Sequence, residues 1–279
     1  MPAAPAIHVF SSRSARPKLA AWAMASDVWR HRALVMALLV RQLKIRYRGS
    51  ILGFVWTFLN PLLLMAVYAL VFRFYMRLAV PNYALLLLVG LLPWTWFSSS
   101  LLEGTNSILG GSALVTKSLF PTEILPTVVV LSNMVNFLLS VPLLVIAAWL
   151  YGVPLSPLAW LCLVPVVVLQ ALFTLGLVLA LAALNVHYRD VQHIITNLML
   201  LWFFLTPIVY PASQVPERFQ IILWLNPVAL FVETYHAAFV SASLPDAQTL
   251  GMLGVYTLGS LLIGARIFDG YRDTFPELV

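Results

Sequence analysis

A few polar residues in this sequence have types and spacing that could support metal binding. Asp190 lies three residues from both His187 and His193, and two histidines around an acid can hold a metal ion. The cluster Asn185, Arg189 and Asp190 can also cap the start of a helix, with the arginine at a membrane interface. We favour the cap and predict no metal site.

Motifs for enzymatic chemistry are missing. The sequence has no His-Glu-x-x-His, no Gly-x-Ser-x-Gly and no Gly-x-x-x-x-Gly-Lys-Ser/Thr phosphate loop, and its one cysteine, Cys162, has no partner for a Cys pair. We therefore expect a protein that is not an enzyme and binds no cofactor itself. If ATP drives it, another chain must hold the ATP and Mg²⁺.

Acidic residues and histidines within membrane spans mark proton or ion relays, and here they are nearly absent. Glu233 and His236, one helical turn apart, are the exceptions, and we expect them to line a wet passage. Proton coupling is therefore disfavoured. Sodium sites built from carbonyls and hydroxyls remain open.

Long uncharged stretches dominate the chain. Its 279 residues are 62% hydrophobic and 9% charged, and 63 consecutive residues between Glu123 and His187 contain no Asp, Glu, Lys, Arg or His. About 20 apolar residues cross a bilayer as a helix. We predict an all-α integral membrane protein with six transmembrane helices, at about 51–72, 82–102, 124–150, 158–184, 191–210 and 247–266.

The net charge of +6 is a topology signal and does not indicate nucleic-acid binding. With a cytoplasmic N-terminus, 13 of the 16 Lys and Arg residues fall on the cytoplasmic side and three outside. This bias predicts that both termini are cytoplasmic. We expect residues 1–28 to be a disordered cytoplasmic tail and 271–279 to be a cytoplasmic C-terminus.

Three shorter segments accompany the spans. From Trp29 to Tyr47 apolar residues recur every three or four positions beside basic residues, which predicts an amphipathic helix over 29–47 in the cytoplasmic interface. Ser112–Phe120 is long enough for a short helix in a cytoplasmic loop. Residues 213–243 are too short to cross twice and too apolar for a loop, which predicts a re-entrant hairpin that bends at Asn226-Pro227.

In this order the chain resembles the membrane subunits of ABC-2-type polysaccharide exporters, which move lipid-linked O-antigens, teichoic acids and capsular polymers. The resemblance covers about residues 30–270 and rests on five ordered tracts: 43–56 running into Asn60-Pro61, 90–97, 185–190, 206–211 and 225–227. Each tract is weak alone, but the ordered set is specific. The N-terminal tail is longer than is usual in this family.

The resemblance implies a homodimeric permease in a bacterial inner membrane, with two cytoplasmic ATPase chains and an undecaprenyl-pyrophosphate-linked polysaccharide as substrate. It implies a coupling helix at Ser112–Phe120 and outer gate helices in the hairpin. It also implies that the amphipathic helix meets membrane lipids and the pyrophosphate headgroup. The residues for ATPase coupling are Leu114, Lys117, Leu119 and Phe120, and those for headgroup contact are Arg41, Lys44, Arg46 and Arg48.

Sugar rings stack their C–H faces on aromatic side chains, while their hydroxyls bond to amides and hydroxyls. Candidate residues for the translocation path and gate are Trp56, Asn60, Tyr68, Trp94, Trp96, Tyr210, Trp224, Asn226 and Glu233. Core packing or anchoring at the membrane interface also explains each of them. Two other functions stay open: a permease for small hydrophobic molecules, and a membrane transferase acting on lipid carriers through Glu233, His236 or Asp190.

Overall fold

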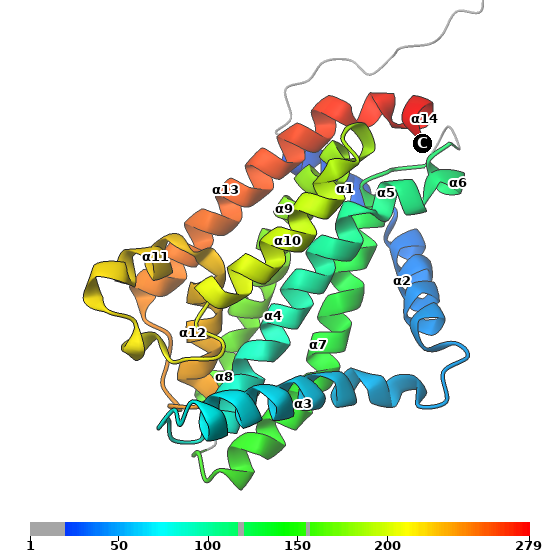
Figure 1. Ribbon diagram of the computed structural model, residues 1–279. Helices are drawn as coiled ribbons and strands as arrows, with labels where there is room; N and C mark the ends of the chain where they lie inside the picture. The colour runs from blue at the N-terminus through cyan, green and yellow to red at the C-terminus, as the bar shows by residue number, and fades with distance from the viewer. Residues whose placement is uncertain (1–19, 117–119, 155–156) are drawn as a thin grey trace, which may run out of the picture.

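The computed structural model describes residues 20–116, 120–154 and 157–279, and every regular element in these ranges is helical. The long helices form one slanted bundle, and α3 runs across it (Figure 1). In chain order the elements are α1 (Ala20–Arg30), α2 (Arg32–Tyr47), the 3₁₀ helix η1 (Gly53–Val55), α3 (Trp56–Tyr68), the π-helix η2 (Ala69–Tyr75), α4 (Tyr83–Thr105), α5 (Ser107–Gly110), α6 (Ser112–Val115), α7 (Ile124–Leu150), α8 (Pro157–Leu161), α9 (Leu163–His187), α10 (Asp190–Leu205), the 3₁₀ helices η3 (Ala212–Gln214) and η4 (Glu217–Phe219), α11 (Gln220–Leu225), α12 (Pro227–Phe239), α13 (Ala247–Tyr271), the 3₁₀ helix η5 (Arg272–Thr274) and α14 (Phe275–Leu278).

Among the described residues, five helices are long and apolar enough to cross a membrane: Gly53–Tyr75, Tyr83–Thr105, Ile124–Leu150, Leu163–His187 and Ala247–Leu278. They coincide with five of the six predicted spans. The remaining one, predicted at 191–210, is the 16-residue α10, which is shorter than the others. It ends before Thr206-Pro207, because proline lacks the N–H that a continuing helix needs.

The predicted hairpin is present as a bent helix pair. Glu217–Leu225 and Pro227–Phe239 meet at 100°. α11 buries none of its residues, whereas α12 is buried along most of its length. The pair therefore has one helix inside the bundle and one on its surface.

α4 is the centre of the bundle. Its Pro93 carbonyl accepts a hydrogen bond from Gln170 of α9 (3.0 Å), and Gln170 in turn accepts one from Tyr235 of α12 (2.9 Å). All three residues are buried, and paired polar groups are what a membrane interior tolerates. This network fixes α4, α9 and α12 against one another.

α9 and α13 approach so closely that their backbones touch. A β-carbon on Gly264 would overlap the carbonyl of Gly176, so only glycine fits there. Ser260 donates to the Phe173 carbonyl (2.7 Å) across the same contact. Small residues and interhelical hydrogen bonds are the usual means of packing helices in lipid.

Both ends of the described chain lie at the same end of the bundle, together with α5 and α6 (Figure 1). Residues 20–28, predicted as part of a disordered tail, are helical in α1. Met24 is buried beside Ala265 and Phe268, because Ala21, Met24 and Val28 form an apolar helical face. Residues 1–19 of the predicted tail lie outside the described residues.

The predicted amphipathic helix 29–47 is two helices, α1 and α2, which meet at His31. α2 follows α7 lengthwise: Val35 and Leu39 pack with Ile124 and Val128 at the start of α7. Where α2 lies relative to a membrane stays a prediction. α2 follows α7 because it has a second apolar face, which the stripe that starts at Trp29 does not include.

Candidate functional site

α2, α4 and α7 enclose a groove that contains an ion pair. Arg46 of α2 bonds to both carboxylate oxygens of Glu103 of α4 (2.8 and 2.7 Å) and to the side-chain oxygen of Asn133 of α7 (2.9 Å). Asn133 also donates to Glu103 (3.2 Å). These three residues, the Arg46 cluster, join the three helices at one point.

Beside Arg46, and one turn further along α7, a second polar contact joins α2 to α7 and to α3. The Tyr47 hydroxyl lies 2.6 Å from the Thr57 hydroxyl and donates to Asn136 (3.0 Å). Arg46 and Tyr47 thus turn the end of α2 toward the bundle. The segment between α2 and α3 is held by side chains and not only by its own backbone.

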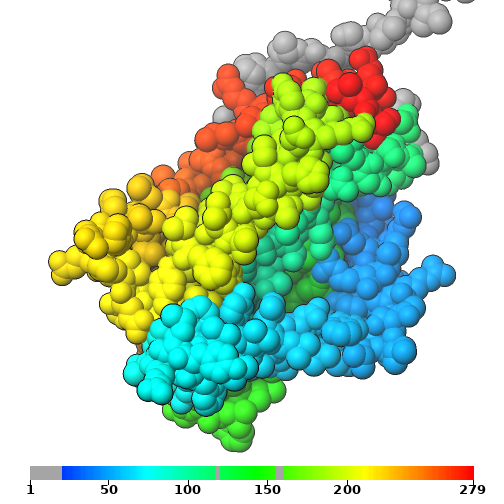
Figure 2. All heavy atoms as spheres, in the orientation of Figure 1, coloured from blue at the N-terminus to red at the C-terminus, as the bar shows by residue number. Residues whose placement is uncertain are grey.

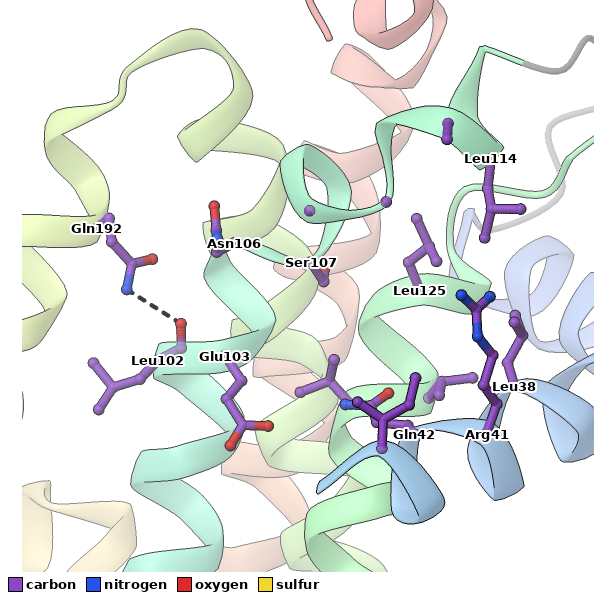
Figure 3. A pocket seen from close by; sticks show the side chains of 16 residues that line it. Leu38, Arg41, Gln42, Leu102, Glu103, Asn106, Ser107, Leu114, Leu125 and Gln192 are labelled. Atoms are coloured by element: carbon purple, nitrogen blue, oxygen red, sulfur yellow. Dashed lines mark hydrogen bonds between the residues drawn. The ribbon is translucent and has the colours of Figure 1, made fainter. Parts of the chain in front are cut away.

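On one side of the Arg46 cluster lies a cavity of about 770 Å³, the α5 cavity. It is lined from α2, α4, α5, α6 and α7 and by Gln192 of α10. In Figure 3, Leu38 and Arg41 stand on one side, and Gln192 lies on the other, bonded to the Leu102 carbonyl at 3.2 Å. Glu103 is part of its wall, so the Arg46 cluster forms one end of this cavity.

On the other side lies a cavity of about 320 Å³, the α3 cavity. Moving along α4 from the α5 cavity to the α3 cavity, the lining runs from Asn106 and Glu103 to Ser99, Trp96 and Leu92. The lining of α7 advances in the same way, from Leu125 to Ser140. The full lining of the α3 cavity is Arg46, Tyr47, Trp56, Thr57, Asn60, Pro61, Leu92, Thr95, Trp96, Ser99, Asn133, Asn136, Phe137 and Ser140.

Three of the nine residues predicted for the translocation path and gate meet in the α3 cavity: Trp56, Asn60 and Trp96. Two more, Tyr68 and Trp94, instead pack on the same ring, Phe203 of α10, at centroid distances of 5.5 and 5.7 Å. Trp94 is buried there, which fits core packing. The predicted path residues therefore do not share one surface within a single copy.

Asn226 has a structural role at the bend of the hairpin. Its side-chain oxygen accepts from the backbone N–H groups of Val228 and Ala229 (3.1 and 3.3 Å) and from the Trp202 indole (2.8 Å). Its amide donates to the Leu205 carbonyl and the Thr206 hydroxyl. It caps α12, whose first residue is Pro227, and fixes the hairpin to the end of α10.

Trp224 and Glu233 line a third cavity, the hairpin cavity, of about 440 Å³ between α11, α12 and the start of α13. Asp246, which caps α13, also lines it, and hydrogen bonds from Thr249 lower the pKa of its carboxyl. Tyr210 lies near this end, with its hydroxyl donating to the Phe204 carbonyl (2.9 Å). The hairpin cavity is thus acidic and has a tryptophan in its wall.

The four basic residues predicted to meet a lipid headgroup divide into two groups. All four are exposed. Arg41, Lys44 and Arg48 border a shallow hollow beside α2, and Arg41 also lines the α5 cavity. Arg46 points into the groove, where Glu103 neutralises it. Helical spacing explains the division, because positions 41, 44 and 48 share a face and position 46 does not.

Within the described residues of the segment predicted to couple to an ATPase, α6 covers Ser112–Val115. Leu114 and Phe120 are partly exposed there. Lys117 and Leu119 lie outside the described residues. α6 lies at the same end of the molecule as α14 (Figure 2), and Figure 1 places α1 at that end too.

The cluster predicted between the fourth and fifth spans also divides. Asn185 is buried near the end of α9, and Arg189 and Asp190 are exposed at the start of α10. His187 lies against Tyr271 (4.5 Å between ring centroids) and within 3.1 Å of the Thr274 hydroxyl. These contacts hold the end of α13 to the end of α9.

Glu103, Asn133 and Asn136 were not predicted as site residues. Their signal is a polar stripe inside uncharged spans: Asn133, Asn136 and Ser140 recur at helical spacing on α7, and Thr95 and Ser99 do so on α4. Such stripes are visible in the sequence. That the two stripes face each other is not, because it depends on the rotation of each helix.

Known proteins are similar to this chain over most of its length. Residues 33–240 match the family described as ABC-2 type transporter. A Myxococcus xanthus protein named O-antigen export system permease protein RfbA is 44% identical over 259 residues, which cover 92% of this chain and 99% of that one. A Klebsiella pneumoniae protein of the same name is 31% identical, covering 88% and 95% of the two chains, and the Escherichia coli polysialic acid transport protein KpsM is 23% identical, covering 84% and 92%. The chain is a member of the ABC-2 type transporter family.

Proposed function

We propose that this protein is the membrane subunit of an ATP-driven exporter that moves an undecaprenyl-pyrophosphate-linked polysaccharide of the O-antigen type outward across a bacterial inner membrane. The observation that carries the proposal is the 44% identity, over nearly the whole chain, to a protein named as an O-antigen export permease. Relatives named for polysialic acid transport and for capsule polysaccharide export support the same class of substrate.

The proposed machine has two copies of this chain and two ATPase chains. The sequence has no phosphate loop, so ATP and Mg²⁺ belong on the partner. The segment Ser112–Phe120 is the proposed ATPase contact, since Leu114 and Phe120 are partly exposed at the end of the bundle that also holds α1 and α14. By the positive-inside bias this end is cytoplasmic.

The exposed face of α2 is the proposed place for the anionic headgroup of the lipid carrier. Arg41, Lys44 and Arg48 border one hollow beside α2, and cations attract phosphate oxygens strongly in the low dielectric near a membrane. Arg46 is less suited to first contact because Glu103 already holds it.

Deletion of the gene tests the proposed function. We expect loss of the polymer from the cell surface and accumulation of the lipid-linked polymer inside, measured by extraction and gel analysis of both pools. A catalytically dead ATPase partner should give the same result. Normal surface polymer with raised drug sensitivity would instead support a permease for small molecules. If deletion stops synthesis of the polymer while the dead ATPase partner does not, the result would support a transferase.

The proposed ATPase contact has its own test. Leu114→Asp with Phe120→Asp should abolish co-purification of the ATPase, because two carboxylates would replace apolar groups in the contact. Leu244→Asp is the matched control, since Leu244 is exposed in the hairpin cavity at the opposite end. Co-purification that persists in the double variant would remove this assignment.

A further inference from the structure

We propose that the α3 cavity is a binding site for one sugar ring of the glycan, formed within a single copy of the chain by α2, α3, α4 and α7. The inference rests on the proposed function for the origin of the sugar. The site itself is argued from its lining, its unpaired groups and its charge.

The lining of the α3 cavity is polar, in contrast to the mostly apolar surfaces of the spans. Hydroxyl and amide side chains from four helices converge there: Tyr47, Thr57, Asn60, Thr95, Ser99, Asn133, Asn136 and Ser140. Polar side chains at membrane depth are costly and are found facing protein or a water-filled cavity. Their convergence in one cavity calls for a polar occupant.

Aromatic rings complete the lining. Trp96 and Phe137 are buried and stack on each other, with ring centroids 5.1 Å apart, so Trp56, which is 37% exposed on the α3 side, is the ring that a sugar would contact. Flat apolar faces beside hydroxyls and amides match a sugar ring, whose C–H faces are apolar and whose edge is hydroxylated. The volume of about 320 Å³ is at the lower end of the range for small-molecule pockets.

Two buried donors in the lining lack a partner. The indole N–H of Trp96 and the amide NH₂ of Asn136 make no hydrogen bond within the described part of the chain, and unpaired buried donors are costly. The hydroxyl protons of Thr95 and Ser140 are used on backbone carbonyls, at 2.7 and 2.9 Å, which leaves their oxygens as acceptors. The acceptor oxygens thus belong to the lining, while the two unpaired donors are covered and lie directly behind it. A hydroxyl requires both kinds of group. A phosphate would use only the donors, and a cation only the acceptors.

The charge of the lining favours a neutral ligand. Arg46 is the only charged residue that lines the α3 cavity in the described chain, and Glu103 pairs with it at 2.7 Å. The Arg46 cluster also separates the α3 cavity from the α5 cavity. A neutral sugar therefore meets no unpaired charge.

Saturation-transfer NMR on the purified protein in lipid nanodiscs tests the site, with methyl glycosides of glucose, galactose, mannose and N-acetylglucosamine as probes. We expect transfer to at least one glycoside at millimolar concentration. The combined change Trp96→Phe and Asn136→Leu should lower its affinity about tenfold, because it removes the indole N–H and the amide of Asn136 while keeping much of each side chain's volume. Asn136→Leu also removes the acceptor of the Tyr47 hydroxyl. Trp94→Phe is the matched control and should bind normally, since Trp94 lies two residues away on α4 and packs on Phe203 outside the cavity.

Absence of transfer to every glycoside would overturn the inference, as would transfer that the double variant leaves unchanged. Equal loss in Trp94→Phe would also overturn it, because the effect would then come from packing of α4. Export in cells is measured separately. If no glycoside binds while export is normal, the binding site is wrong and the proposed function stands. If binding behaves as expected while deletion leaves the surface polymer intact, the proposed function is wrong and the binding site stands.

Discussion

α3 and α4 look alike in sequence and behave differently in the fold. The span Gly53–Tyr75, which contains α3, and the helix α4 are each 23 residues long, and their mean hydropathies are 1.9 and 1.7. The buried share of the most apolar stretch is nevertheless only 6% in the first and 78% in the second. Pro61 is the only buried residue of α3. Hydropathy measures transfer out of water and does not distinguish protein from lipid as the apolar neighbour, so it predicts both helices equally well.

The largest expected effect concerns what covers α3. Asn60 is exposed on this helix, and an exposed amide within a span is better satisfied by protein than by lipid. We expect a second copy to pack on α3. In a Cys162→Ser background, Val67→Cys should cross-link most of the protein into dimers with a short bis-maleimide in membranes, as seen on non-reducing gels. Leu88→Cys, buried in α4, should stay monomeric.

If cysteines at Leu63, Leu64 and Val67 all leave the protein monomeric under these conditions, lipid and not a second copy covers α3. All three positions are exposed in the single copy, so access of the reagent does not limit the experiment.

The next effect is on stability. Leu88→Ala should cost about 2–5 kcal/mol, because it leaves a hole at the centre of the bundle. Leu64→Ala removes the same atoms from an exposed position on α3 and should change the stability of the single copy by no more than about 0.5 kcal/mol. Thermal unfolding followed by tryptophan fluorescence in detergent measures both. Equal losses would mean that α3 is packed as tightly as α4.

The smallest expected effect is the difference in stability between changes at the two Asn-Pro pairs, Asn226-Pro227 and Asn60-Pro61. Asn226→Ala should cost about 1–3 kcal/mol, because it leaves the Trp202 indole and the first N–H groups of α12 without an acceptor. Asn60→Ala, at an exposed position, should cost no more than about 0.5 kcal/mol in the single copy. The same unfolding assay applies. A reversed order would show that Asn226 is not the cap that holds the hairpin.

The fold could be predicted from the sequence where the signal is local. Uncharged stretches of about 20 residues mark helices, and Asn226-Pro227 marks a bend, because proline restricts its own backbone and that of the residue before it. Residues 20–28 were mispredicted as tail because one short apolar face, centred on Met24, is a weak signal. The four basic residues were predicted as one group for headgroup contact because their positions in the sequence do not show which side of the helix faces the bundle.

The amino-acid sequence by itself determined that the chain is helical, crosses a membrane and belongs with ABC-2 exporters, since length, hydropathy and ordered tracts are properties of the chain alone. Only the tertiary structure decided that Arg46 pairs with Glu103 and Asn133, that Trp94 packs on Phe203 while Trp96 lines a cavity, and that α3 is exposed. The physical reason is that these outcomes depend on how each helix is rotated and what packs against it. Contacts between segments 30 to 87 residues apart set that rotation, and no local pattern records it.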